Sequence, residues 1–327
     1  YILYFAGMFG FDRLLPMNTG VEACETAVKL ARKWGYQVKG IEENKAKVIF
    51  AENNFWGRSI AAVSSSSDPE SYSNFGPFLP GSFESVPYND LAALAKALES
   101  DANICAFMVE PIQGEAGVVV PDEGYLKGVR ELCSKHNVLF IADEVQTGLG
   151  RTGRLLCLDH SDVKADIFQS LKLLLSLSSH FEQGITGSFC RRYREHTVFH
   201  NSIPRTYGGN PLACAVAKTA VEVLVEEGMI ENAEILGTEL RRELKALDPN
   251  TITNVRGKGL LSSMTIPERA GLSAWDFCLM LKDRGVLAKP THGDKVRLAP
   301  PLVLNNEQLS KALEAIADTA TAYNQKL

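Results

Sequence analysis

The sequence lacks several features that would assign it to a specialised class of protein. No apolar run among its 327 residues is long enough to cross a bilayer, so we expect no membrane-spanning helix. The net charge of −5 comes without any block of like charge, and nothing indicates binding to nucleic acid or to a membrane surface. The seven cysteines include no CxxC pair. An odd, dispersed set indicates buried thiols in a reducing compartment rather than a disulfide framework.

Metal-ligand spacing and a targeting signal are also missing. His196 and His200 are four residues apart, which alone is weak evidence, and we expect no metal site. The first seven residues, YILYFAG, contain neither a basic n-region nor an initiator Met, so they do not predict a signal peptide. We expect the chain to begin inside a fold, with any targeting segment outside it.

Alternating strand and helix patterns predict an α/β fold with a mostly parallel sheet flanked by helices. Residues 47–51, 104–109 and 138–142 are almost continuous apolar runs, typical of strands covered on both faces. Residues 64–85 are rich in serine, proline and glycine and are expected to form a loop.

The pattern changes after a helix predicted at about residues 211–227. Two further helices, at 273–284 and 307–323, flank β-like segments at 259–266 and 295–298. We therefore expect a large domain at residues 1–227 and a smaller C-terminal α/β domain at residues 228–327.

The segment NTGVEA at residues 18–23 is predicted to open a helix. Thr19 and Glu22 have the spacing of a capping box. The free N–H groups and the positive end of the helix dipole make such a turn an anion site, although an ordinary capped helix has the same pattern.

Carboxylates follow two of the predicted strands. Asp143 ends one strand, at the edge where ligands bind in parallel sheets, and could hold a protonated pyridine nitrogen or simply cap a helix. Glu110 and Glu115 follow another strand and could position amino groups, pair with an arginine, or form a polar loop.

Two arginines lie in contexts that suit binding. In Phe55-Trp56-Gly57-Arg58, the phenylalanine could stack on a planar cofactor and the arginine could clamp a carboxylate, or the segment could be an amphipathic loop packed on the core. Arg297 lies in an apolar strand and requires a carboxylate partner, from either the protein or a substrate.

Together these motifs resemble the class III, fold type I pyridoxal-phosphate (PLP) aminotransferases. The resemblance covers residues 10–167 and 206 to about 320. Within the family, THGD–VRLAPP with NFWGR fits the ornithine aminotransferases better than the acetylornithine or 4-aminobutyrate enzymes. The motifs in family order are NTGVEA, NNFWGRS, EPIQGEAGV, LFIADEVQTGLGRTGR, TYGGNPLACAVA, VRGKGLL and LAKPTHGDKVRLAPPLV.

The resemblance implies PLP as cofactor and transfer of the ornithine δ-amino group to 2-oxoglutarate. It implies that the backbone of Gly20 and Val21 holds the phosphate, that Phe55 stacks on the ring, and that Asp143 pairs with the ring nitrogen. Gln146 would contact the 3-oxygen of the ring.

Further roles carried over from the family concern the dimer, the substrate and the Schiff base. Thr206 would reach the phosphate in a neighbouring subunit, which implies a homodimer or a higher homo-oligomer. Arg58 would bind a substrate carboxylate, with Glu110 also at the substrate. Glu115 and Arg297 would form a pair that closes for ornithine and opens for the dicarboxylic partner. The family also implies the mitochondrial matrix, with the cytoplasm as the alternative.

Lys172 aligns with the Schiff-base lysine, at the family distance from Asp166-Ile167, but its surroundings differ. Leu171 replaces the expected glycine, and the following Gly-Gly is missing. The sharp edges of the atypical stretch, residues 168–205, indicate a displaced reading frame or a wrong exon. We expect this stretch to be the least well packed. A further N-terminal segment of the family is absent here, so a catalytically impaired or truncated relative is the alternative function, as is another class III aminotransferase.

Overall fold

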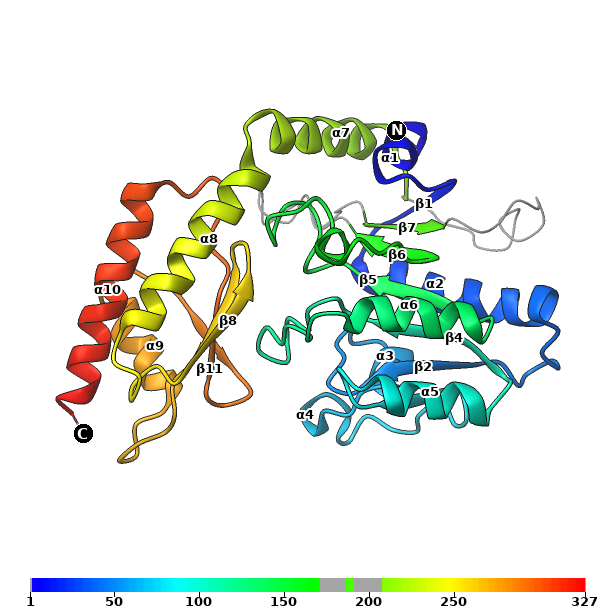
Figure 1. The fold of residues 1–327 in the computed structure, drawn as a ribbon, viewed down its shortest axis with the longest axis horizontal. Helices are drawn as coiled ribbons and strands as arrows, with labels where there is room; N and C mark the ends of the chain where they lie inside the picture. Colours follow the sequence, from blue (N-terminus) through cyan, green and yellow to red (C-terminus); the bar gives the residue numbers. More distant parts are fainter. Residues whose placement is uncertain (1, 171–185, 191–207, 327) are drawn as a thin grey trace. The chain divides into compact units, whose positions relative to one another are not determined.

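The computed structural model describes residues 2–170, 186–190 and 208–326 (Figure 1). They form two compact units. The first unit takes its described residues from Tyr1–Pro111, Pro121–Gln146 and Leu158–Val223. The second comprises Ile112–Val120, Thr147–Cys157 and Leu224–Leu327, so two short segments from the first half of the chain group with the C-terminal residues. The predicted boundary between residues 227 and 228 stays a prediction.

The first unit is built on a seven-stranded, mostly parallel sheet, which confirms the predicted fold class. The five strands from β3 to β6 run parallel, whereas β7 pairs antiparallel with both β6 and β1. The order across the sheet is β1 (Arg13–Met17), β7 (Thr186–Cys190), β6 (Ile167–Ser170), β5 (Leu139–Asp143), β4 (Ile104–Val109), β2 (Lys47–Ala51) and β3 (Phe83–Val86).

Helices cover both faces of this sheet, with α2 on one face and α5 and α6 on the other (Figure 1). Every residue of β4 and β5 is buried, which explains the unbroken apolar sequence of β4 and the apolar run of β5 that precedes Asp143. The helices of the unit are α1 (Ile2–Phe9), α2 (Gly20–Trp34) with a π-helical turn at Gly35–Lys39, α3 (Ile60–Ser64), α4 (Pro69–Tyr72), α5 (Leu91–Ser100), α6 (Tyr125–Lys135), a 3-10 helix at Cys157–Ser161, and α7 (Pro211–Glu226), whose last residues belong to the second unit.

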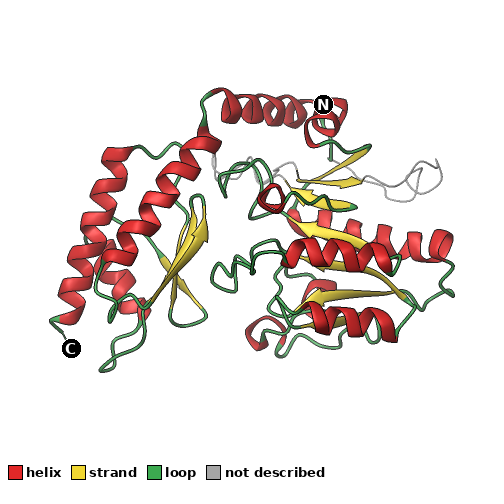
Figure 2. Cartoon of the chain, in the orientation of Figure 1, coloured by secondary structure: helices red, strands yellow, loops and turns green. Residues whose placement is uncertain are grey.

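The second unit contains a four-stranded antiparallel sheet and three helices (Figure 2). Its core combines one face of this sheet with the apolar stripes of the helices, among them Leu240, Phe277 and Tyr323. The strand order is β10 (Lys289–Thr291), β11 (Lys295–Leu298), β9 (Leu261–Thr265) and β8 (Asn254–Lys258), and the helices are α8 (Met229–Ala246), α9 (Ala274–Lys282) and α10 (Asn306–Asn324).

Most expected elements form within one or two residues of their predicted bounds, but the loop expected at residues 64–85 is partly wrong. That stretch contains α4 and most of β3. The strand is a short edge strand in which only Val86 is buried, so it lacks the continuous apolar run of the central strands. Helix α8 was not predicted at all.

The expectation of poor packing applies to residues 168–205, most of which lie outside the described residues. Residues 168–170 are fully buried in β6. Lys172, His196, His200 and Thr206 lie outside the described part of the chain. In the described part, no helix combines the length and apolar character needed to cross a membrane.

Candidate active site

The first turn of α2 presents two free backbone donors. The predicted capping box is confirmed: Glu22 N donates to Thr19 Oγ1, and Glu22 Oε2 accepts from Thr19 N at 3.1 Å and Asn18 N at 2.8 Å. These bonds leave the N–H groups of Gly20 and Val21 without an acceptor among the described residues. Both lie at the positive end of a 15-residue helix, which favours an anion.

Asp143 is a buried carboxylate at the carboxyl end of β5. Its side chain is 5% exposed, and burial raises its pKa from 3.8 to about 6, despite the lowering effect of hydrogen bonds from Val145 N and the Cys24 thiol. No lysine or arginine of the described residues forms an ion pair with it. Residues 145–152 form turns, so the alternative role as a helix cap is wrong. Among the described residues the carboxylate is therefore buried without a cationic partner, a combination that suits a cationic ligand.

The first turn of α2 and the buried carboxylate lie next to each other. Cys24, on the second turn of α2, donates from Sγ to Asp143 Oδ2 at 3.4 Å. A Cβ added to Gly20 would lie 3.1 Å from Cγ1 of Val145, two residues after Asp143. One cofactor can therefore reach both groups, as the predicted site requires.

The loop after β2 approaches the same turn of α2. Gly57 has φ +148°, and a Cβ there would lie 2.3 Å from Cγ2 of Val21. Only glycine allows this approach, because the backbone conformation and the neighbouring side chain both exclude a Cβ. The sequence motif did not reveal this role of Gly57.

The four residues of the FWGR motif divide between core and surface. Trp56 is 5% exposed and stacks on Phe50, as the packed-loop alternative predicted. Phe55 is half-buried, and its N–H donates to Glu110 Oε1 at 3.0 Å. The Arg58 guanidinium is exposed and lies 6.0 Å from the centre of the Phe55 ring. The structure thus brings Phe55, Arg58 and Glu110 together.

Gln146, the other predicted cofactor contact, is half-buried in the turn that follows Asp143. It is only three residues beyond the carboxylate in the chain. Lys172 and Thr206, the remaining predicted cofactor contacts, lie outside the described residues.

The expected pair between Glu115 and Arg297 is present in the second unit. Arg297 Nη1 lies 2.7 Å from Glu115 Oε1, and the two side chains are 29% and 34% exposed. Arg297 comes from β11, and Glu115 comes from a turn bounded by a backbone bridge between Gln113 and Val119. The partner of the strand arginine is therefore a protein carboxylate.

Three polar residues at the site were missed as site candidates. Cys24 was expected only as one of the dispersed buried thiols, although its side chain contacts Asp143. Gln169 pairs in register with Asp143, and neither its amide nor the hydroxyl of Ser170 has a hydrogen-bond partner among the residues that the structure describes, although both residues are fully buried. The sequence feature that could have identified Gln169 and Ser170 as site candidates is a pair of polar residues at the end of an apolar strand.

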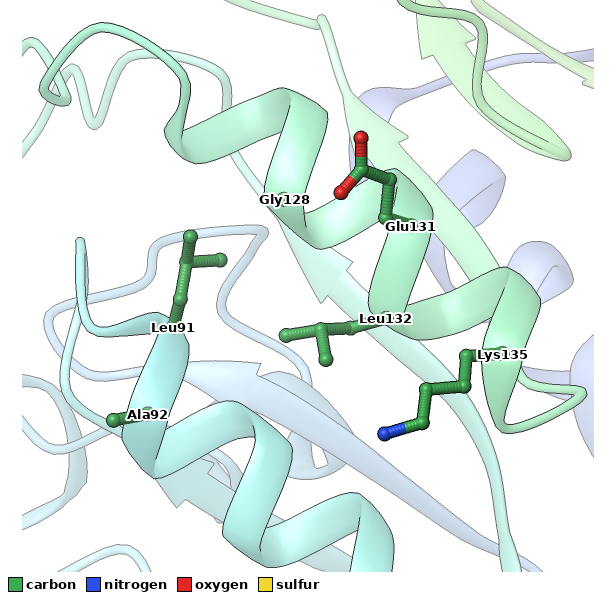
Figure 3. A pocket seen from close by; sticks show the side chains of 6 residues that line it. All are labelled: Leu91, Ala92, Gly128, Glu131, Leu132 and Lys135. Carbon is green, nitrogen blue, oxygen red and sulfur yellow. The ribbon is translucent and has the colours of Figure 1, made fainter.

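A pocket outside this site lies between α5 and α6. It has a volume of about 520 Å³. Figure 3 shows Leu91 and Leu132 pointing into the space between the two helices. None of the predicted site residues lines it, so it does not bear on the chemistry described above.

The arrangement around Asp143 fits PLP. The cofactor carries a phosphate at one end and a basic ring nitrogen at the other. Two helix N-terminal amides that have no acceptor in the described part of the chain match the phosphate. A buried carboxylate that has no cation beside it in the same part of the chain matches a protonated ring nitrogen.

Known proteins resemble this chain along almost its whole length. Residues 2–320 match the family model for class-III aminotransferases. The mitochondrial ornithine aminotransferase of Rattus norvegicus is 54% identical over 323 residues, covering 99% of this chain and 72% of the rat protein.

Two solved structures are similar in both sequence and fold. Ornithine aminotransferase from Toxoplasma gondii, described with partial occupancy of PLP at its active site, is 46% identical with a TM-score of 0.92 and covers 99% of this chain and 76% of its own. Acetylornithine aminotransferase from Elizabethkingia anophelis is also 46% identical, with a TM-score of 0.82 and coverages of 98% and 77%. The chain belongs to the class-III aminotransferases, a family of PLP-dependent enzymes.

Proposed function

We propose that this chain is an ornithine aminotransferase, which moves the δ-amino group of ornithine to 2-oxoglutarate and gives glutamate 5-semialdehyde and glutamate. The observation that carries the proposal is the 54% identity to the rat enzyme over 323 residues. The ion pair at Arg297, which the family resemblance predicted from sequence, supports the same choice.

PLP, when bound, supplies an electron sink that stabilises negative charge at the reacting carbon. The N–H groups of Gly20 and Val21 would hold its phosphate, and Phe55 would stack on its ring. Asp143 would pair with the ring nitrogen, and Gln146 would contact the 3-oxygen. Thr206 would contribute to the phosphate site of a neighbouring subunit.

Asp143 has the properties that this role requires. Burial raises its pKa to about 6. In the same buried environment the carboxylate attracts a cation at hydrogen-bond distance more strongly than it would in water. The hydrogen bonds from Val145 N and Cys24 Sγ fix the orientation of the carboxylate and leave lone pairs on both oxygens for the ring N–H.

Lys172 is our proposed general acid–base. Its Nζ would move a proton between the substrate carbon that carries the amino group and a carbon atom of the bound cofactor. A lysine does this only when its amine is neutral, which desolvation and nearby cations favour.

Glu115 and Arg297 would select between the two substrates. While paired, they present no free cation to the diamine. A dicarboxylic substrate would place its second carboxylate on Arg297 and displace Glu115. Since both side chains are about a third exposed, the pair is worth only about 0–1 kcal/mol, and a substrate can open it easily. Arg58 would hold the other substrate carboxylate, with Glu110 fixing the neighbouring Phe55 through its backbone N–H.

The test is amino transfer by the purified chain with ornithine, acetylornithine or 4-aminobutyrate as donor and 2-oxoglutarate as acceptor. We expect ornithine to be preferred and Lys172→Ala to be inactive while still folded. A folded chain that takes up no PLP would refute the proposal and favour the catalytically impaired relative. Preference for acetylornithine would instead support the other class III activity. Resequencing of the transcript across residues 160–210 would show whether the atypical stretch is genuine.

We further propose that the active form is a homodimer acting on small amino acids and 2-oxo acids. The relatives from rat and Drosophila melanogaster are named as mitochondrial, which supports the mitochondrial matrix as the compartment. We also retain the division into a cofactor-binding domain at residues 1–227 and a small domain at 228–327 as a proposal.

A further inference from the structure

The carbonyl oxygen of Gly117 accepts an unusual number of hydrogen bonds. Arg256 donates to it from Nε at 2.9 Å and from Nη2 at 2.7 Å, and Ser263 donates from Oγ at 2.8 Å. A carbonyl oxygen has two lone pairs, so three donors saturate it. Gly117 is only two residues after Glu115, and these bonds therefore act on the turn that carries the carboxylate.

Further hydrogen bonds and a buried side chain hold the rest of this turn together with Gly117. Gln113 and Val119 exchange backbone hydrogen bonds at 3.1 and 3.0 Å. Val118 is fully buried, and Thr291 Oγ1 donates to the carbonyl oxygen of Glu115 at 2.8 Å. We call residues 113–119 the Glu115 turn.

Gly117 also brings its backbone close to the antiparallel sheet. Its φ is +94°, and a Cβ at this position would lie 2.5 Å from Cδ of Lys295 and 3.2 Å from Nη2 of Arg256. A side chain here would push the turn off the sheet, because both the backbone conformation and the available space require glycine.

The residues that hold the turn form one row across three strands. Arg256 on β8 pairs in register with Ser263 on β9, and Ser263 pairs with Arg297 on β11. Residues directly opposite each other in an antiparallel sheet point to the same face. The same row therefore holds Gly117 through Arg256 and Ser263, and the carboxylate of Glu115 through Arg297.

We propose that Arg256 is a positioning residue that sets substrate preference, because it holds the Glu115 turn at the place where Glu115 reaches Arg297. This inference rests on the proposed role of Glu115. Arg256 touches the turn and not the carboxylate, so its effect on substrates passes through Glu115. Its guanidinium is partly desolvated, which lowers its pKa and strengthens its hydrogen bonds to the carbonyl.

If Arg256 acts in this way, removing its hydrogen bonds to Gly117 should change how well a dicarboxylate binds. Loss of the Arg256 bonds loosens the turn, so Glu115 occupies Arg297 for less of the time. A free dicarboxylate then competes better for Arg297. A monocarboxylate diamine, which does not use Arg297, gains nothing.

The experiment measures binding of glutarate, an unreactive five-carbon dicarboxylate, to the PLP-saturated chain by titration calorimetry. Glu115→Ala is expected to tighten glutarate binding by up to about fivefold, because glutarate no longer has to break a partly exposed ion pair to reach Arg297. Arg256→Met is expected to tighten it in the same direction by a smaller factor, roughly twofold to threefold. The double variant should match Glu115→Ala alone, since both changes act through one carboxylate.

Arg241→Met is the matched control. Arg241 is also a half-buried arginine of the second unit that donates to a glycine carbonyl oxygen, that of Gly259, but it does not contact the Glu115 turn. It should leave glutarate binding unchanged. Ser263→Ala removes one of the three donors with a smaller loss of stability, and should shift binding in the direction of Arg256→Met.

The outcomes separate this inference from the proposed function. If Glu115→Ala tightens glutarate binding while Arg256→Met and Ser263→Ala do not, Arg256 has no positioning role and the Glu115 switch stands. If Glu115→Ala has no effect, the switch itself is wrong, and the inference fails with it. If Arg241→Met tightens glutarate binding as much as Arg256→Met does, the inference is also overturned. The effect would then come from a general loosening of the second unit.

Discussion

Asp143→Asn should stabilise the cofactor-free protein, although it removes a predicted cofactor contact. Asp143 is 5% exposed, and burial raises its pKa from 3.8 to about 6. Between pH 4 and 6 the folded protein therefore retains a proton that the unfolded chain releases. The free energy of unfolding falls as the pH rises through this window, because the carboxylate must ionise in a buried position. Asparagine has nearly the same shape and carries no charge, so it avoids this loss.

The magnitude follows from the size of the pKa shift. A rise from 3.8 to about 6 is about two units, and each unit corresponds to about 1.4 kcal/mol. The gain in stability of Asp143→Asn over the wild type should be near zero at about pH 4 and should reach about 3 kcal/mol above about pH 6. The same variant should bind PLP more weakly, since it loses the negative charge that faces the ring nitrogen.

The assay is urea unfolding of the cofactor-free protein at several pH values between about 4.5 and 7.5. Asp166→Asn is the matched control: Asp166 is also 5% exposed, but it is 2.7 Å from Arg130 Nη1 and accepts from Phe140 N at 2.9 Å. Breaking that pair should destabilise the protein by about 3–5 kcal/mol, the opposite sign. If Asp143→Asn is no more stable than the wild type at neutral pH, the buried carboxylate is not penalised and the reasoning is refuted.

Three further substitutions test the surroundings of Asp143. Gly57→Ala should strain the loop by about 1–3 kcal/mol and push Val21 aside, so PLP affinity measured by equilibrium dialysis should fall. Thr19→Ala should lower the free energy of unfolding, measured in urea, by about 1 kcal/mol because α2 loses its N-cap. Cys24→Ala should raise the pKa of Asp143 further, because the thiol hydrogen bond lowers it, and a carbon-13 NMR titration of the carboxyl group would measure the change.

The substitutions of Gly57 and Cys24 each have a direct control. Gly40→Ala also replaces a glycine at positive φ, +81°, but a Cβ there meets open space, so PLP affinity should be unchanged. Cys24→Ser keeps a donor and should return the pKa of Asp143 toward the wild-type value. An unchanged pKa in Cys24→Ala would show that the 3.4 Å contact has no electrostatic effect.

The sequence by itself determined the elements whose signals are local. Residues 47–51 and 104–109 form strands at their predicted bounds because both faces of a central parallel strand are buried and almost every position is therefore apolar. The capping box at Thr19 and Glu22 needs only two residues three apart, and it formed as predicted. The position of Asp143 at a strand end likewise follows from the neighbouring sequence.

Only the tertiary structure decided which distant residues meet. The Cys24 thiol reaches a carboxylate 119 residues away, and Glu115 meets Arg297 across 182 residues. The grouping of residues 112–120 with the C-terminal unit was not visible in the sequence either. These contacts depend on strand order, on register and on the close approach of a glycine backbone. Each is fixed by packing across the whole unit, because a shift of one residue in register would turn the side chains of a strand to the opposite face.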